Sequence, residues 1–167
     1  MLQVHALTLG AYQVNCYIIH DEKSTSCCVI DPGYEADTIL DKLSELGLTL
    51  EAILLTHGHF DHVGAVRDIA ADTGCQVYLC ADDLCLPTNL TAGKLYYTQT
   101  YAEGTRLHLA GLDITGLQKL GWLHPHTHSG RSSCSNNGAR LQCHALAQLA
   151  NSAAHRLNHI LGIAALA

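Results

Sequence analysis

The sequence predicts an α/β fold in which strands and helices alternate along the chain. A short apolar segment at residues 27–30 is followed by a helical pattern at 36–46 and by a second apolar segment at 52–55. Another helical pattern, at 63–71, leads to an apolar segment at 77–80. Two strand–helix–strand units in series are typical of a layered α/β fold.

Two further strands are expected before these units, over residues 1–9 and 12–20. Both segments are rich in β-branched and aromatic residues, and Gly10 separates them. The strand at 27–30 ends at Asp31-Pro32-Gly33, because proline and glycine stop a strand.

The helices are predicted from the spacing of their apolar residues. In the first helix these residues recur every three or four positions, and Gly47 ends the pattern. They are Ile39, Leu40, Leu43 and Leu46. The second helix is expected to end before Thr73-Gly74. Ligand sites in such folds gather beyond the C-terminal ends of strands, so the residues that follow the strand at 52–55 are the first candidates for function.

The rest of the chain has weaker patterns. Residues 86–103 are expected to form a connection without regular structure, and residues 107–114 a hairpin around Ala110-Gly111. Residues 129–138 (SGRSSCSNNG) resemble a flexible linker. Two weakly amphipathic helices are expected after it, at 141–150 and 153–161.

Charge divides the chain into two parts. Residues 1–113 hold 5 basic and all 15 acidic residues, a net charge of −10, whereas the last 54 residues hold 4 basic residues and no acid, a net charge of +4. Six of the 12 histidines also lie after residue 113. We therefore expect residues 1–114 to form one structural unit, and residues 115–167 to be a C-terminal segment of different character, aberrant or disordered.

Composition excludes several classes of function. The net charge of −6 argues against a nucleic-acid partner, which a basic surface would favour. The sequence holds no apolar stretch of membrane-spanning length and no signal-peptide pattern, so we expect no membrane partner and a cytoplasmic location. The eight cysteines include no C-x-x-C pair, and most are expected to be small buried hydrophobic residues.

A cluster of possible metal ligands follows the strand at 52–55. Residues 56–62 read T-H-G-H-F-D-H and contain four potential ligands: His57, His59, Asp61 and His62. Imidazole nitrogen and carboxylate oxygen suit zinc. His57 and His59 can face one ion, while Asp61 and His62 can reach a second ion, about 3.5 to 4 Å from the first in two-metal hydrolases.

This motif resembles the H-x-H-x-D-H signature of the metallo-β-lactamase superfamily. The surrounding segments, Leu9-Gly10-Ala11-Tyr12, Asn15-Cys16-Tyr17 and Val29-Ile30-Asp31-Pro32-Gly33-Tyr34, are similar to its glyoxalase II-like branch over residues 1–114. The resemblance implies an αββα sandwich, zinc, and hydrolysis of a thioester such as S-lactoylglutathione or of a related small ester. It also implies that metal-bound hydroxide attacks the carbonyl, and that Asp61 binds an ion and holds the nucleophile.

Other chemistries of the superfamily fit the sequence less well. Secreted lactamases need an export signal, and RNA-processing members favour a basic surface. Oxygen-reducing di-iron members usually have glutamate where His59 stands. A zinc hydrolase is the interpretation that remains.

The sequence after residue 114 departs from the superfamily pattern. The segment 123–130 (LHPHTHSG) gives His126 as the best match to a further metal-binding histidine, but the glycine expected before it is missing and His128 replaces a small residue or proline. No Asp or Glu follows Asp113, so the expected bridging carboxylate is absent and a second zinc ion should bind weakly. No metal-binding role is assigned to His144, His155 or His159.

Two alternatives therefore stay open. The chain can be a catalytically inactive metal-binding remnant of the fold, in which only the motif at 57–62 survives. Independently, His124, His126 and His128 can chelate a borderline metal without a catalytic purpose, because alternate residues of an extended segment face the same way.

A change of reading frame between residues 115 and 123 would explain the acid-free composition, the excess of histidine and the imperfect match together. We therefore predict that the coding DNA, read in another frame after codon 115, encodes an amino-acid sequence similar to that of the superfamily. Sequencing the gene across codons 110–167 tests this directly. The hypothesis fails if no alternative frame encodes such a sequence.

Overall fold

The computed structural model describes residues 1–91, 93–116, 118–119, 142–143 and 148–149. Six strands form the main sheet in the order β1-β2-β3-β4-β5-β6. Their bounds are β1 Leu2–Leu9, β2 Val14–Asp21, β3 Ser26–Ile30, β4 Thr49–Leu54, β5 Gln76–Cys80 and β6 Gln99–Tyr101. The first three strands pair antiparallel, and β3 to β6 pair parallel.

The helices connect the parallel strands. Helix α1 (Ala36–Leu46) lies between β3 and β4, and α2 (Phe60–Val63) and α3 (Val66–Thr73) lie between β4 and β5. A 3-10 helix, η1 (Ala81–Cys85), directly follows β5. No helix in the described part of the chain is long and apolar enough to cross a membrane.

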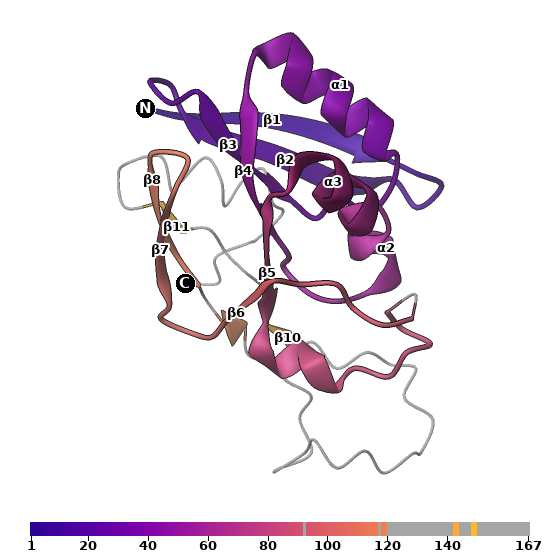
Figure 1. Ribbon diagram of the computed structural model, residues 1–167. Coiled ribbons are helices and arrows are strands. Elements are labelled where there is room, and N and C mark those ends of the chain that lie inside the picture. The colour runs from indigo at the N-terminus through magenta and orange to yellow at the C-terminus, as the bar shows by residue number, and fades with distance from the viewer. Residues whose placement is uncertain (92, 117, 120–141, 144–147, 150–167) are drawn as a thin grey trace.

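A smaller set of strands makes a second β layer. Strands β7 (Arg106–Leu109) and β8 (Leu112–Thr115) form a hairpin, β11 (Gln148–Leu149) pairs with β8, and β9 (Gln118–Lys119) pairs with β10 (Gln142–Cys143). In Figure 1 the helices α1, α2 and α3 lie on one side of the main sheet and the β7–β8 hairpin lies on the other. The described residues therefore form helix, sheet and sheet layers of the metallo-β-lactamase sandwich type that the resemblance implies.

Alternating side chains of the central strands fill a core on each face of the main sheet. Ile18, Val29 and Ile53 pack on the helix side, whereas the next residue of each strand, Ile19, Ile30 and Leu54, packs against the β7–β8 side. All six are at most 3% exposed. Because both faces are covered, the central strands read as continuous apolar runs in the sequence.

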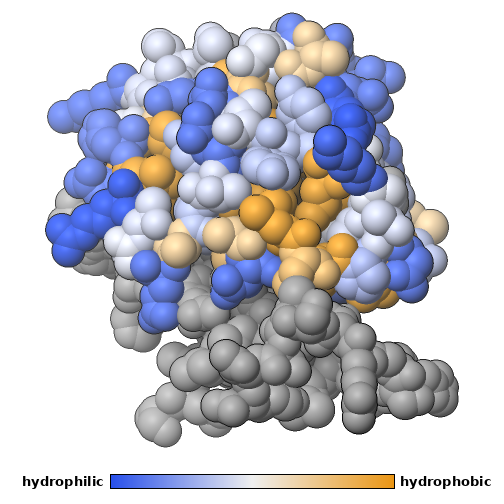
Figure 2. Space-filling view, turned by 60° about the horizontal axis from the view of Figure 1, so that its bottom comes forward, coloured by the Kyte–Doolittle hydropathy of each residue, from blue (hydrophilic) through white to orange (hydrophobic). Residues whose placement is uncertain are grey.

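A small cavity between the sheets is lined by Ile30, Leu54, Tyr101, Leu107 and Ile114. Figure 2 shows hydrophobic side chains on the face it presents, next to the residues drawn in grey.

The helix predicted at residues 36–46 and the hairpin predicted at 107–114 are confirmed. Ala110 and Gly111, at the hairpin turn, both have positive φ, at 53° and 73°, as a two-residue type I′ turn requires. The expectation that most cysteines are buried is confirmed for Cys16, Cys27, Cys28 and Cys75.

Three predictions of local structure are wrong in part. The helix expected at 63–71 is two helices, because α2 ends at Val63 and α3 begins at Val66. The connection expected at 86–103 contains β6, whose three residues are too few to give an apolar pattern. The helix expected at 141–150 is wrong at 142–143 and 148–149, which are strands β10 and β11. The linker at 129–138 and the helix at 153–161 lie outside the described residues.

Candidate metal centre

The parallel strands β3, β4 and β5 end at one edge of the main sheet, and the motif lies there. Asp31 follows β3, Thr56 and His57 follow β4, and Asp83 follows β5 within η1. The backbone that leaves β4 is held on both sides, because Asp31 N–H donates to the carbonyl of Leu54 at 3.2 Å and the Tyr101 hydroxyl donates to the carbonyl of Leu55 at 2.7 Å. We refer to residues 55–62 as the metal loop.

Asp31 is the main anchor of the metal loop. Its Oδ1 accepts the Thr56 N–H at 2.8 Å, and its Oδ2 accepts the Thr56 hydroxyl at 2.5 Å and His62 Nδ1–H at 2.9 Å. The residue is only 5% exposed and its backbone has a φ of 51°, in the left-handed region. Sequence reasoning gave Asp31 no role in the site, although its place directly after a buried strand was the signal that could have found it.

These hydrogen bonds fix which ring nitrogen carries the proton in two histidines. The Thr56 hydroxyl has one proton, which it donates to the Asp31 carboxylate, so the 2.9 Å contact with His57 Nδ1 makes that nitrogen the donor. His62 Nδ1 is likewise the donor to Asp31. In the neutral form of each ring, Nε2 is therefore the nitrogen with the lone pair, which is the form that binds a metal.

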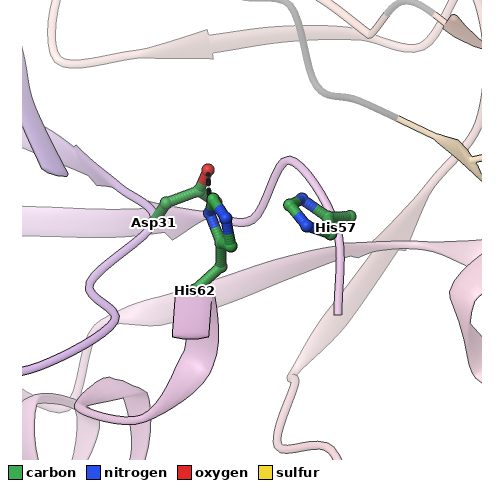
Figure 3. A group of neighbouring side chains, drawn as sticks. All are labelled: Asp31, His57 and His62. Atoms are coloured by element: carbon green, nitrogen blue, oxygen red, sulfur yellow. Dashed lines mark hydrogen bonds and ion pairs between the residues drawn. The ribbon is translucent and has the colours of Figure 1, made fainter. Parts of the chain in front are cut away.

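The potential ligands of the metal loop lie close together. One ligand atom each from Asp31, His57 and His62 lies within 4.8 Å of the other two. Figure 3 shows the His62 ring beside the Asp31 carboxylate and the His57 ring across from them. The His57 ring is 4.0 Å from the His62 ring and 4.6 Å from the His59 ring, between centroids. The structure thus brings His57, His59 and His62 together, whereas His126 lies outside the described residues.

Asp61 completes this group on the Nε2 side of His62. The distance from Asp61 Oδ2 to His62 Nε2 is 3.6 Å. Two ligands of a tetrahedral zinc ion, each about 2.1 Å from the metal, are about 3.4 Å apart. Asp61 and His62 therefore have the spacing of two ligands of one ion, and the imidazole and carboxylate donors present fit a zinc ion chemically.

Two glycines let the loop after β3 touch the metal loop. A Cβ added to Gly33 would lie 1.8 Å from the carbonyl oxygen of Asp61, and a Cβ added to Gly64 would lie 2.2 Å from the carbonyl oxygen of Gly33. No side chain fits at either position, since both contacts are with backbone. This close approach is what allows Asp31 to reach His62.

Charge around His62 favours a cation. Burial lowers the pKa of His62, but the hydrogen bond to Asp31 and the negative charges of Asp31 and Asp61 outweigh burial, so the pKa of His62 is raised overall. The two carboxylates that stabilise imidazolium would stabilise a bound metal ion in the same way.

A second buried carboxylate holds the centre of the metal loop. Asp83, 2% exposed, accepts the Gly58 N–H at 2.8 Å through Oδ2. Burial raises the pKa of Asp83 to about 7, and the charges of Asp82 and Asp31 act in the same direction, while the hydrogen bond from Gly58 opposes them. Sequence reasoning missed Asp83 as well, because nothing in its neighbourhood marks it as buried.

Exposed aromatic side chains lie beside the metal loop. The Phe60 ring, between His59 and Asp61 in sequence, meets the Tyr12 ring edge to face at 5.6 Å, and Tyr12 stacks on Tyr34 at 6.5 Å. Tyr12 is 67% exposed and Phe60 38%. We call Tyr12, Tyr34 and Phe60 the aromatic rim.

Comparison with known proteins agrees with this geometry. The family model described as the metallo-beta-lactamase superfamily matches residues 9–136. The chain belongs to the metallo-beta-lactamase superfamily. The resemblance identified in the sequence is therefore confirmed, and the superfamily match continues past residue 114 to include His126.

Two curated relatives match part of the chain. The hydroxyacylglutathione hydrolase GloC of Haemophilus influenzae is 36% identical over 77 residues, which are 46% of this chain and 36% of that protein. The probable polyketide biosynthesis zinc-dependent hydrolase PksB of Bacillus subtilis is 42% identical over 69 residues, 41% of this chain and 31% of that protein. The matched segments thus span about a third of the length of these curated relatives.

Solved structures of the superfamily share the fold. The B3 metallo-beta-lactamase BLEG-1 superposes with a TM-score of 0.60 at 24% identity, covering 69% of this chain and 59% of that one. TTHA1623 in a di-iron-bound form superposes with a TM-score of 0.55 at 33% identity, covering 68% of this chain and 60% of that one. The sandwich fold predicted from the resemblance is therefore confirmed.

The raised pKa of His62 predicts how zinc affinity depends on pH. Zinc at Nε2 must displace a proton whenever His62 is protonated, so affinity should be constant well above that pKa and fall at least about tenfold per pH unit below it. Zinc titration of the purified chain between pH 8 and pH 5.5 measures this. His108→Gln, which changes an exposed histidine paired with Asp113, should leave the profile unchanged. A profile that is flat across this range would contradict the assignment of His62.

The anchoring role of Asp31 predicts a loss of metal affinity on substitution. Asp31→Asn keeps the shape of the side chain but replaces one accepting oxygen with an NH2 group. At least one of the hydrogen bonds that Thr56 and His62 donate to Asp31 is therefore lost. We expect zinc affinity to fall about 10- to 100-fold and the free energy of unfolding to fall by about 1 to 3 kcal/mol. Chelator competition and urea unfolding measure the two quantities. Asp41→Asn, at an exposed position of α1, is the control, and equal zinc affinity in the two variants would refute the role.

Proposed function

We propose that the chain is a zinc-dependent hydrolase of thioesters or similar small esters. The observation that carries the proposal is the fixed orientation of His57 and His62, whose Nε2 atoms are set as lone-pair nitrogens by Thr56 and Asp31. The names of the relatives support the same class of reaction, since one is a hydroxyacylglutathione hydrolase and another a probable zinc-dependent hydrolase.

In this proposal His57, His59, Asp61 and His62 hold the metal, with His126 as a further ligand. When bound, zinc makes water nucleophilic at neutral pH and polarises a carbonyl group. Asp61 is the catalytic residue, because a carboxylate at the metal can also accept a hydrogen bond from the attacking water and orient it toward the substrate carbonyl. Asp31 keeps His62 in position and does not touch the substrate.

The substrate that fits is a small molecule with a hydrophobic part. The aromatic rim gives the acyl or thiol portion an exposed apolar surface beside Asp61. The net charge of −6 does not favour a nucleic-acid partner, and a cytoplasmic location with a metabolic thioester as substrate is part of the proposal.

The second candidate is a metal-binding remnant without activity. It is favoured by one observation, the lack of any Asp or Glu after Asp113, which removes a bridging carboxylate from that part of the chain. Under this alternative the metal loop still binds one ion, but no substrate is hydrolysed.

Metal content and thiol release distinguish the two candidates. The purified full chain, loaded with zinc, should bind one or two ions and release thiol from S-lactoylglutathione or a simple acyl thioester. Asp61→Asn should lower the rate about 100-fold or more, because it removes the carboxylate that orients the nucleophile. His108→Gln should have no effect, since this residue is an exposed side chain of β7, which is not part of the metal loop.

His126→Ala then tests the remaining ligand. It should abolish hydrolysis if His126 completes the centre, and leave the rate unchanged if the histidines at 124, 126 and 128 only chelate metal. One bound zinc ion with thiol release no faster than in metal-free protein would establish the remnant and refute the hydrolase.

A further inference from the structure

Asp83 is a buried acid outside the ligand motif. It belongs to η1, at the end of β5, and its side chain is 2% exposed while its neighbours Asp82 and Leu84 are exposed. Carboxylates are almost never buried to this degree unless they have a partner that repays desolvation. The partner of Asp83 is the Gly58 N–H, at 2.8 Å.

The partner of Asp83 is the backbone between two candidate ligands. Gly58 separates His57 from His59, so the direction of its peptide groups determines how both side chains leave the loop. The hydrogen bond that the Gly58 N–H donates to the Asp83 carboxylate restrains the peptide that links His57 to Gly58. The backbone that carries this carboxylate is itself held, because the Asp83 carbonyl accepts the Leu86 N–H at 3.0 Å and closes the η1 turn.

Apolar contacts hold Gly58 against the same segment. A Cβ added to Gly58 would lie 3.0 Å from a methyl group of Leu95 and 3.3 Å from one of Leu86, so the glycine backbone packs against both leucines. Leu86 directly follows η1. The hydrogen bond and the packing therefore come from one side and leave the loop little freedom there.

We propose that Asp83 is a positioning residue of the metal centre, which sets the Gly58 backbone and thereby aims His57 and His59 at a common point. This role requires a bound metal but no particular substrate, so it goes beyond the proposed hydrolysis. Outer groups that orient metal ligands typically change metal affinity about 10- to 100-fold when they are removed.

Three substitutions separate this role from a purely structural one. Asp83→Asn keeps an oxygen that can accept the Gly58 N–H, whereas Asp83→Ala removes it and Asp83→Glu displaces it by one methylene group. Zinc affinity, measured by chelator competition, should fall at least about tenfold in the alanine and glutamate variants and stay within about threefold in the asparagine variant. Asp82→Asn, which removes an exposed charge from the same helix, is the control.

A second readout follows the hydrogen bond itself. Exchange of the Gly58 amide proton in the metal-free protein should be fast in Asp83→Ala and slow in the wild type and in Asp83→Asn. If the alanine variant does not fold, Asp83→Glu carries both measurements.

Three results would overturn the proposal. The first is a zinc affinity of the folded alanine or glutamate variant within twofold of that of the wild type. The second is a loss of zinc affinity in the asparagine variant as large as in the alanine variant. The third is a wild-type chain that binds no zinc. Because neither readout is catalytic, a chain that binds zinc but hydrolyses nothing would refute the hydrolase and leave this role intact.

Discussion

The site depends on the carboxylate of Asp31, which ties the end of β3 to the metal loop after β4. Its three hydrogen bonds reach the Thr56 backbone, the Thr56 hydroxyl and the His62 ring, and through Thr56 they also determine the protonated nitrogen of His57. Removing one partner of such a buried network leaves polar groups unsatisfied and costs about 1 to 3 kcal/mol each. All three hydrogen bonds join protein groups, so folding itself orients the ligands and lowers the entropic cost of binding a metal.

The sequence predicts those parts of the fold that depend on local patterns. Helix α1 has the predicted bounds because its apolar residues recur at helical spacing and Gly47 takes the left-handed conformation that ends it, with a φ of 65°. The break between α2 and α3 has another origin, because the Ala65 N–H between them donates to the carbonyl of Pro32, more than thirty residues earlier, at 3.0 Å. Strand β6 was missed for a similar reason, since its pairing with β5 and not its own composition makes it a strand.

The same limit applies to the site. The ligand motif is contiguous, so His57, His59, Asp61 and His62 could be singled out from the sequence. The two carboxylates that support it act across 25 residues, Asp31 on Thr56 and Asp83 on Gly58. Both reach the metal loop because parallel strands end at one edge of the sheet, and only the strand order of β3, β4 and β5 shows which loops become neighbours there.

The distribution of carboxylates also bears on how many ions the site can hold. No acid follows Asp113, so any carboxylate between two ions must come from the residues already described. At the metal loop these are Asp31 and Asp61. An ionised carboxylate has about four lone-pair positions, and three of those on Asp31 already accept hydrogen bonds from Thr56 and His62. Asp61 is then the carboxylate placed to bind a metal directly, while Asp31 acts on the metal by its charge and through His62. A single coordinating carboxylate with three imidazoles suits one divalent ion better than two.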